Sequence, residues 1–378
     1  MSREYLVALA RRYLSEALTN ERVGNYADAS RCYRKAAEIL LMMAKNNPQD
    51  PLSSTYRELA ESYLRKAKEL EEGQKIVLGG GKGASEGDIE KIVEEFIVKE
   101  KPSVRFEDII GLEEAKQAIM DAIVYPTKRP DLFPLGWPRG ILLFGPPGCG
   151  KTMLAAAVAN EIDGIFIQVD AATIMSKWLG EAEKKVAAIF RYARKISSEE
   201  KKPVVVFIDE CDALLGVYEH EIGGEARVRN QFLKEMDSLN DKSRRLFVYV
   251  IAATNKPWKL DLGFIRRFQR RIYVPPPNKE ARKALFEYYT RFLKLAPDVD
   301  FDRLAEMTEG YSASDIRDIV MEAHLITVRE LFRSGRIDGE PRPITMSDFV
   351  LAISRRRPSI SREMLLAYEE WAKRYGSI

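Results

Sequence analysis

Cysteine and histidine are scarce in this sequence. The 378 residues include two histidines and three cysteines, which are Cys32, Cys149 and Cys211. The cysteines lie far apart, in a spacing that fits neither a disulfide framework nor a zinc site. We therefore expect free thiols, a reducing compartment inside the cell, and no histidine-based metal site.

Long apolar runs and an excess of charge of one sign are also missing. Sixty Lys and Arg against 57 Asp and Glu leave a net charge of +3, which argues against a general nucleic-acid binder. No uninterrupted apolar stretch reaches the roughly 20 residues of a membrane span, and the first residues lack the apolar core of a signal peptide. With 46% hydrophobic and 31% charged residues, the composition indicates a soluble globular protein with room for about two or three domains. Together with the free thiols and the missing signal peptide, this leads us to expect a cytoplasmic location.

The first part of the chain carries a helical pattern throughout. Apolar residues recur at helical spacing in three runs, which are separated near Gly24 and near Pro48. The sequence therefore predicts three short antiparallel helices within residues 1–72. Residues 73–103 are expected to be a linker, because six glycines fall within the fifteen positions of 73–87.

Strands alternate with helices from about residue 104. The strand candidates are the apolar segments 141–144, 165–169, 204–208, 247–252 and 271–274. Almost purely apolar strands are typical of a parallel sheet that helices cover on both faces. We expect a large α/β domain over residues 104–277, a small helical domain over 278–358 and a final helix within 359–378.

A glycine-rich segment, Gly-Pro-Pro-Gly-Cys-Gly-Lys-Thr, occupies residues 145–152 between the first strand and a helix. Backbone N–H groups and the helix N-terminus bind phosphate in this G-x-x-x-x-G-K-[ST] pattern. Lys151 supplies positive charge to the β- and γ-phosphates, and the hydroxyl of Thr152 can ligate Mg²⁺. ATP with Mg²⁺ is therefore the predicted ligand. The nucleotide contacts expected here are Pro147, Gly148, Cys149, Gly150, Lys151, Thr152 and Met153.

Two interpretations of Cys149 are open. Its position among the loop amides and near Lys151 could lower the pKa of the thiol and make it reactive. A small residue that only fills space is the simpler interpretation, and we favour it.

Two of the buried strands end in polar side chains. Asp209 and Glu210 follow the strand at 204–208, and Asn255 follows the strand at 247–252. Ligands bind at this edge of an open parallel sheet. We expect Asp209 to position Mg²⁺, Glu210 to polarise the attacking water, and Asn255 to hydrogen-bond the γ-phosphate or that water. A helix cap or an ordinary turn would explain either motif if it stood alone.

Together these motifs resemble one AAA ATPase cassette over roughly residues 104–378. The resemblance is carried by Phe106-Glu-Asp-Ile-Ile-Gly-Leu-Glu, the phosphate loop, Asp209-Glu210, Ala253-Thr-Asn255 and Gly310-Tyr-Ser-Ala-Ser-Asp-Ile316. Residues 357–376 resemble the closing helix of the meiotic clade, which contains katanin, spastin and the vacuolar-sorting ATPase that disassembles ESCRT-III. The N-terminal helices are similar to a microtubule-interacting-and-transport (MIT) domain. In combination the chain resembles the archaeal cell-division branch of these ATPases.

The resemblance implies roles that spacing alone does not give. Lys177, Trp178 and Leu179 match the first pore loop, whose aromatic residue grips a threaded polypeptide. The resemblance also adds Asp108 and Ile110 to the nucleotide contacts. Arg266 and Arg267 match the arginine-finger segment, which completes the active site of a neighbouring subunit. Some relatives carry three consecutive arginines where this chain has Ile265 first, so the choice between Arg266 and Arg267 stays open.

Two further departures from the family pattern bear on binding. Ala313 stands where relatives often have glycine in the turn near the adenine. Residues 334–343 are too few for the β-domain that the eukaryotic vacuolar-sorting enzyme inserts nearby. Dependence on the protein cofactor that docks on that β-domain is therefore not expected.

The function implied by the resemblance is disassembly of ESCRT-III-like filaments in archaeal cell division or membrane scission. A homo-oligomer, hexameric when ATP is bound, would pull filament subunits through its pore after the N-terminal helices recruit them. Partners would bring it to the membrane or division site, and no nucleic-acid partner is expected. The alternatives are a cytoskeleton-severing ATPase of the same clade and a nucleotide-switched scaffold without turnover-driven work. Five lysines against six acids in residues 73–101 argue against the attraction to acidic tails that severing needs.

Overall fold

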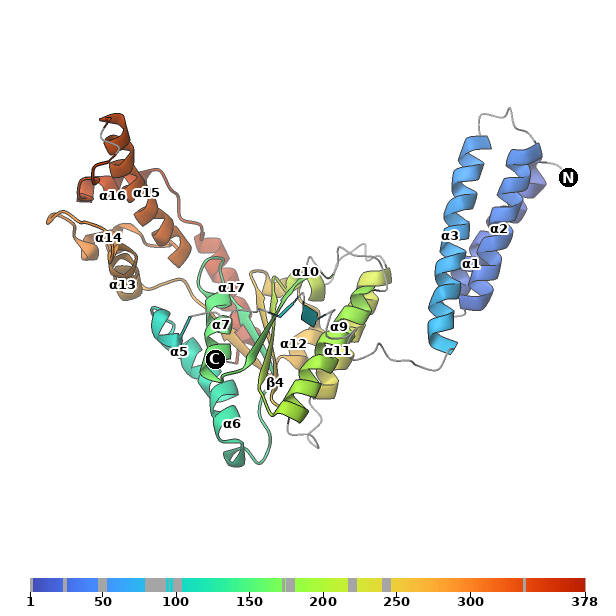
Figure 1. The fold of residues 1–378 in the computed structure, drawn as a ribbon, viewed down its shortest axis with the longest axis horizontal. Helices are drawn as coiled ribbons and strands as arrows, with labels where there is room; N and C mark the ends of the chain where they lie inside the picture. Colours follow the sequence, from blue (N-terminus) through green and yellow to red (C-terminus); the bar gives the residue numbers. More distant parts are fainter. Residues whose placement is uncertain are drawn as a thin grey trace. The chain divides into compact units, whose positions relative to one another are not determined.

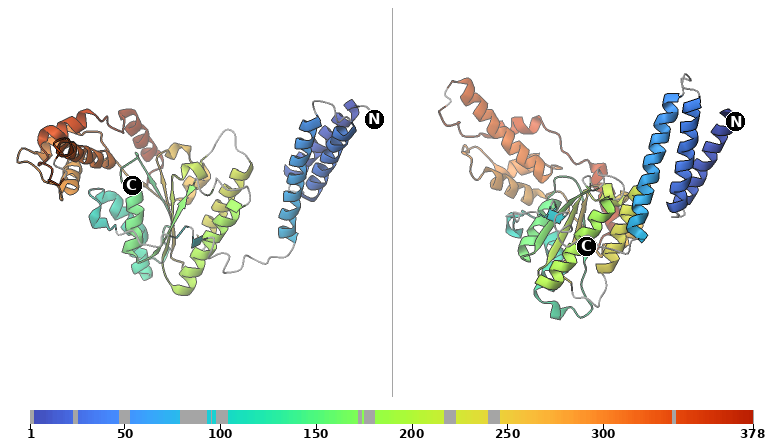
Figure 2. Two further views of the ribbon diagram at one scale, coloured as in Figure 1. Left: turned by 45° about the horizontal axis from the view of Figure 1, so that its top comes forward. Right: turned by 45° about the vertical axis from the view of Figure 1, so that its right-hand side comes forward.

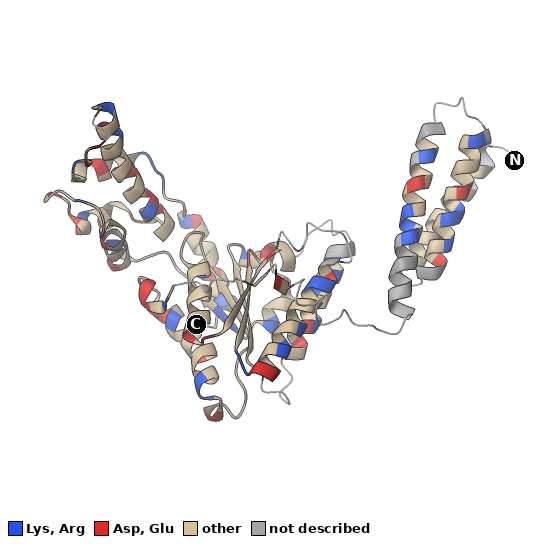
Figure 3. Cartoon of the chain, in the orientation of Figure 1, with Lys and Arg blue, Asp and Glu red and all other residues tan. Residues whose placement is uncertain are grey.

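The computed structural model describes residues 3–22, 26–46, 53–78, 93–94, 96–97, 104–171, 174, 181–216, 223–239, 246–335 and 338–377. The chain forms two compact units, which are Met1–Ser85 and Glu86–Ile378. Lys and Arg are interspersed with Asp and Glu on the helices of both units (Figure 3). None of the helices in the described ranges is long and apolar enough to cross a membrane.

The first unit contains the three predicted helices. They are α1 (Arg3–Arg22), α2 (Tyr26–Asn46) and α3 (Ser53–Leu78). Small side chains let the helices approach closely, since Ala17, Ala29, Ala36, Ala37, Ala60 and Ala67 are all buried. Helices α2 and α3 run antiparallel, because Tyr33 packs against Tyr63 with ring centroids 6.1 Å apart, while Ser30 Oγ donates to the carbonyl of Ala67 at 2.9 Å.

Helix α3 continues past the boundary that we expected at residue 72. It ends at Leu78, so residues 73–78 are helical instead of belonging to the linker. Gly73 alone costs a helix only about 1 kcal/mol relative to alanine, and the dense glycine cluster starts at residue 79. The helix therefore runs until that cluster.

The second unit is built on a five-stranded parallel sheet with the order β2-β3-β4-β1-β5. The strands are β1 (Gly140–Phe144), β2 (Ile165–Asp170), β3 (Val204–Asp209), β4 (Val248–Thr254) and β5 (Arg270–Tyr273). All five predicted strands are present. Strands β1 and β4 are buried along their whole length, which explains why their sequences are nearly all apolar.

Helices cover both faces of this sheet (Figure 1; Figure 2). One face carries α5 (Glu113–Ile119) and α7 (Lys151–Glu161), with the π-helical turn η2 (Met120–Val124). The other face carries α9 (Glu181–Lys195), α10 (Asp212–Leu215), α11 (Gly223–Leu239), α12 (Leu262–Arg267) and α17 (Arg362–Tyr375). The remaining short elements are η1 (Phe106–Asp108), α6 (Tyr125–Lys128), η3 (Pro130–Leu132), η4 (Ile196–Glu200) and η5 (Pro257–Lys259).

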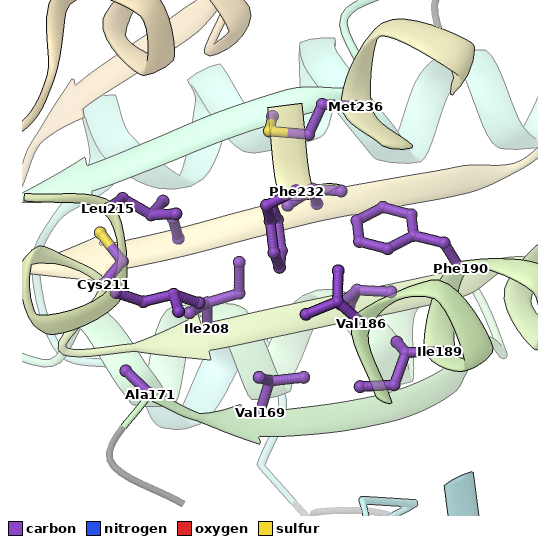
Figure 4. Packing of buried hydrophobic residues seen from close by; sticks show 14 of the residues in the cluster. Val169, Ala171, Val186, Ile189, Phe190, Ile208, Cys211, Leu215, Phe232 and Met236 are labelled. Carbon is purple, nitrogen blue, oxygen red and sulfur yellow. The ribbon is translucent and has the colours of Figure 1, made fainter. Parts of the chain in front are cut away.

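Aromatic and branched side chains fill the layer beneath α9 and α11 (Figure 4). Phe190 of α9 and Phe232 of α11 meet edge to face with ring centroids 5.1 Å apart. Val186 and Ile208 pack in the same cluster. Each such fully buried side chain contributes about 1.5–3 kcal/mol to folding. This layer packs against β3, whose last residue, Asp209, lies at the edge of the sheet.

Part of the expected linker lies against the sheet. The side chains of Val93 and Phe96 are buried, and the carbonyl of Phe96 accepts a hydrogen bond from Gln168 N at 2.9 Å. Ile97 pairs with Ile167 of β2 in an antiparallel bridge. These apolar residues follow the glycine cluster and extend the edge of the sheet, so the expectation that the linker runs to residue 103 was wrong here.

The small helical domain is present as predicted. It contains α13 (Lys279–Thr290), α14 (Phe301–Met307), α15 (Ala313–Arg333) and α16 (Met346–Ser354). Side chains of Asn278, Asp300 and Ser312 cap the first turns of α13, α14 and α15. Phe286 and Phe349 pack edge to face in its core, 6.1 Å apart. Helix α17 then returns to the large sheet.

Candidate nucleotide site

The glycine-rich loop joins β1 to α7 and needs glycine at several positions. Gly145, Gly148 and Gly150 have positive φ values of 150°, 72° and 98°, which side-chain-bearing residues rarely adopt. A Cβ atom on Gly145 would lie 2.2 Å from the carbonyl oxygen of Val274, and one on Gly148 would lie 2.8 Å from Ser312 Oγ. The loop is therefore pressed between the end of β5 and the start of α15.

Lys151 begins α7 and is only 7% exposed. Its ammonium donates to the carbonyls of Gly145, at 2.9 Å, and Pro146, at 2.7 Å. Burial lowers the pKa of Lys151 to about 8. The lysine thus lies under its own loop with acceptors that phosphate oxygens can replace.

Nucleotide affinity should fall above about pH 8. Phosphate charge favours the protonated lysine, so binding must take up a proton once Lys151 has become neutral in the free protein. The dissociation constant for ATP should then rise by up to about tenfold per pH unit toward pH 10. Titration of fluorescent ATP between about pH 7 and about pH 10 measures this.

A Cys149→Ala variant is the control for the pH experiment. Burial raises the pKa of the Cys149 thiol to about 12, which is above the pH range of the titration. The variant should therefore keep the same pH profile. An affinity that stays constant up to pH 9.5 or so would contradict the assignment to Lys151.

Asp209 and Thr152, the two expected Mg²⁺ ligands, lie next to each other. Thr152 Oγ1 donates to Asp209 Oδ2 at 2.9 Å, and the other carboxylate oxygen accepts from Glu210 N at 2.9 Å. Hard oxygen ligands of this kind suit Mg²⁺. The structure therefore brings a hydroxyl and a carboxylate together beside the phosphate loop.

The backbone of Glu210 is strained. Its φ is +47°, in the left-handed region where residues other than glycine are uncommon. The turn is held by hydrogen bonds from Cys211 N to the Ala253 carbonyl and from Ala213 N to the Glu210 carbonyl, both 2.9 Å. The Glu210 residue is exposed at the edge of the sheet. Strained backbone conformations of this kind cluster at functional sites.

Asn255 lies at the same edge, because it follows β4 and β4 pairs with β3. Its Oδ1 atom is buried without a hydrogen-bond partner in the described parts of the chain. The preceding residue is fixed, since Thr254 Oγ1 donates to Asp212 Oδ1 at 2.7 Å and accepts from Lys256 N at 2.9 Å. A buried polar atom of this kind is typical of a group that awaits a ligand.

A mainly apolar cavity of about 410 Å³ opens beside the loop. Its walls come from residues 110–115, from 275–278 and from the small domain, and include Ile110, Cys149 and Ala313. A flat base would fit such walls. Asp108 is not part of the lining: its carboxylate accepts from Arg105 N at 2.8 Å and caps η1.

Cys149 and Met153, two further expected nucleotide contacts, differ in their exposure. Cys149 is buried, and its thiol lies 3.7 Å from the Pro147 carbonyl. Because burial raises its pKa, the space-filling interpretation fits better than a reactive thiol. Met153 is 42% exposed on the first turn of α7. Lys177, Trp178 and Leu179, expected in the pore loop, lie outside the described residues.

Arg266 and Arg267 end α12 in different surroundings. The guanidinium of Arg267 donates to both carboxylate oxygens of Asp237, at 2.9 and 3.0 Å, and to the carbonyl of Gly263 at 3.1 Å. Asp237 raises the pKa of Arg267. Arg266 is exposed and makes no hydrogen bond or ion pair within the described ranges. Of the two, Arg266 is therefore free to reach another chain.

The start of α15 touches the phosphate loop, a contact that the sequence motif alone did not reveal. Ser314 N donates to the carbonyl of Gly148 at 3.2 Å. Asp315 accepts from Ser312 Oγ and from Ser359 Oγ. Burial alone would raise the pKa of Asp315, but the hydrogen bonds from Ser359 and Ser312 outweigh it and the pKa is lowered. The ionised carboxylate ties the segment before α17 to α15.

Four sequence models of known families match the chain. They are the ATPase family associated with various cellular activities (AAA) at residues 141–276, the AAA+ lid domain at 298–351, the MIT (microtubule interacting and transport) domain at 8–72, and the Vps4 C terminal oligomerisation domain at 338–376. Along the chain the MIT match comes first and the AAA match second, and the lid and C-terminal matches follow and overlap at residues 338–351.

Two relatives match along more than nine tenths of this chain. Cell division protein C of Sulfolobus acidocaldarius is 51% identical over 374 residues, which cover 99% of this chain and 98% of that protein. Vacuolar protein sorting-associated protein 4 of Dictyostelium discoideum is 33% identical, covering 93% and 86%. Among solved structures, the FIGL-1 AAA domain in complex with ADP is 33% identical with a TM-score of 0.68, covering 79% of this chain and 100% of that one. The chain therefore belongs to the AAA ATPase family, as an ATP-hydrolysing member with an N-terminal MIT domain and a Vps4-type C-terminal segment.

Proposed function

We propose that this ATPase disassembles ESCRT-III-like filaments by pulling their subunits through the pore of a hexameric ring, in archaeal cell division or membrane scission. The observation that carries the proposal is the match to cell division protein C over 99% of the chain, from the MIT domain to the closing helix. The match to vacuolar protein sorting-associated protein 4 supports it.

The geometry of the sheet edge supports the following catalytic roles. Lys151 and the loop N–H groups bind the β- and γ-phosphates. Asp209 and Thr152 would hold Mg²⁺, which when bound would neutralise charge on the phosphates. Glu210 accepts a hydrogen bond from the attacking water and polarises it. Asn255 orients that water or the γ-phosphate through its amide. The cavity beside Ile110 takes the adenine.

A neighbouring subunit completes the site. Arg266 is exposed at the end of α12, whereas Arg267 is held by Asp237. We assign the leading finger role to Arg266, which stabilises charge on the transferring phosphoryl group across the subunit boundary. Arg267 keeps the end of α12 in place. Oligomerisation thus switches on hydrolysis.

The MIT domain recruits the filament, and the AAA cassette pulls its subunits through the pore. Lys177, Trp178 and Leu179 grip the threaded chain, because an aromatic side chain offers broad contact at low entropic cost. Tethering raises the effective concentration of a weakly held subunit, so the recruiting contact need be only micromolar. The protein acts in the cytoplasm, reaches the membrane through its partner, and uses no nucleic acid.

A filament-release assay tests this function. Full-length protein with Mg-ATP should move subunits of preformed ESCRT-III-like filaments from pellet to supernatant. A chain that starts at Glu86, the first residue of the second unit, should hydrolyse ATP normally but release subunits at least about tenfold more slowly, because the recruiting tether is lost. Equal release by both chains would contradict recruitment through the MIT domain.

Two further outcomes would overturn the proposal. If the protein cosediments with a filament that has acidic tails and shortens it, the severing function is correct. If turnover is negligible at every protein concentration, the chain is a nucleotide-switched scaffold. The ring model requires specific activity to rise with protein concentration, since the finger comes from a second subunit.

A further inference from the structure

Helix α17 packs on one face of the sheet, close to the edge where Asn255 follows β4. Tyr368 is 0% exposed and lies 5.3 Å from Trp258 and 6.2 Å from Tyr273, measured between ring centroids. Trp371, one turn further along, meets Phe144 of β1 edge to face at 4.4 Å. The ring of Tyr368 is thereby fixed at the end of the sheet where Asn255 lies.

The hydroxyl of Tyr368 has a specific partner. It donates a hydrogen bond to the backbone carbonyl of Asn255, 113 residues away in the sequence. Burial raises the pKa of Tyr368 to about 12, so the hydroxyl keeps its proton and remains a donor. The contact joins the C-terminal helix to the residue that faces the γ-phosphate in the proposed mechanism.

This contact completes the support of the Asn255 backbone. Thr254, on one side, is bonded to Asp212, and Lys256 N, on the other, is bonded to Thr254 Oγ1. Tyr368 holds the carbonyl of Asn255 itself. The Asn255 Oδ1 atom, in contrast, is buried and has no partner within the described ranges. The backbone is therefore fixed while the side-chain acceptor is left for a ligand.

We propose that Tyr368 is a positioning residue for ATP hydrolysis: its hydroxyl fixes the Asn255 peptide and so places the Asn255 amide against the attacking water or the γ-phosphate. The inference rests on the proposed role of Asn255 and goes beyond it, because it assigns part of the catalytic geometry to α17. An amide that is misplaced by even a fraction of an ångström loses much of its value in the transition state.

Tyr368→Phe tests the inference in the full chain. The variant keeps the ring and removes only the hydrogen bond, so kcat for ATP should fall about tenfold, while KM and oligomer formation should change less than about twofold. Tyr375→Phe on the same helix is the matched control, because the Tyr375 ring packs against Trp371 and the Arg374 guanidinium and its hydroxyl makes no hydrogen bond to Asn255. This variant should keep the wild-type kcat. Thermal unfolding of both variants shows that each is folded.

A double-mutant cycle with Asn255→Ala separates positioning from packing. If Tyr368 acts through Asn255, adding Tyr368→Phe to Asn255→Ala should lower kcat by less than about twofold. If the two substitutions lower kcat independently, so that their effects multiply in the double variant, the inference is wrong. It is also wrong if Tyr368→Phe keeps the wild-type kcat. A slow Asn255→Ala beside a normal Tyr368→Phe leaves the proposed role of Asn255 intact. A normal Asn255→Ala removes both that role and the inference.

Discussion

Arg266→Ala is expected to lower kcat by about 10³-fold while leaving nucleotide affinity nearly unchanged. An arginine supplied by a neighbouring subunit is worth about 10³–10⁵ in related phosphoryl transfers. Arg266 is the exposed arginine at the end of α12, since Arg267 is paired with Asp237. Steady-state turnover at saturating ATP, together with fluorescent-nucleotide binding, measures both quantities.

Mixing experiments show whether the arginine acts between subunits. Arg266→Ala subunits still carry Glu210, and Glu210→Gln subunits still carry Arg266. A mixture of these two inactive proteins should therefore regain part of the wild-type activity where an intact Glu210 faces an intact Arg266. If mixed oligomers recover no activity, or if Arg266→Ala monomers are less active than wild-type monomers, Arg266 acts in the active site of its own subunit.

Glu210→Gln is expected to lower kcat by about 10²–10⁴-fold and to leave ATP bound. Glutamine keeps the size of the side chain but cannot act as the base that polarises water. The exposed position of Glu210 at the sheet edge means that the loss of charge should cost little stability. Single-turnover hydrolysis and size-exclusion chromatography in Mg-ATP measure the rate and the retained oligomer.

Two results would contradict the role of Glu210 in polarising the attacking water. If the Gln variant hydrolyses ATP at the wild-type rate, the strained turn after β3 serves structure and another group activates the water. If it fails to bind ATP, the residue belongs to the binding site. A Glu210→Gln protein that binds ATP, assembles and stalls is the only outcome that fits the proposed role.

The phosphate loop and the sheet could be predicted because their signals are local. A strand, a glycine-rich turn and a helix follow one another within residues 140–161, and the backbone positions that need glycine are in the motif itself. The buried strands could be predicted from their nearly continuous apolar sequences. Asp209, Glu210 and Asn255 could be placed at one edge because parallel strands end there.

What the sequence could not provide are contacts between distant residues. The choice between Arg266 and Arg267 depends on Asp237, which lies 30 residues away. The bond from Tyr368 to Asn255 spans 113 residues, and neither residue type signals it. The end of the linker was misjudged for a similar reason, since Phe96 and Ile97 find their partners only on β2.

The carboxylate of Asp315 has a consequence for the nucleotide cycle. It accepts hydrogen bonds from Ser312, at the start of α15 in the lid, and from Ser359, in the segment that leads into α17. Ser314 N also donates to the carbonyl of Gly148 in the phosphate loop. If the lid swings away to release the base of a spent nucleotide, it must either drag α17 or break these bonds. Because the hydroxyl of Tyr368 on α17 bonds to the carbonyl of Asn255, we expect such a movement of the lid to reach Asn255. We therefore expect release of the base and the placement of the Asn255 side chain to be coupled through α17.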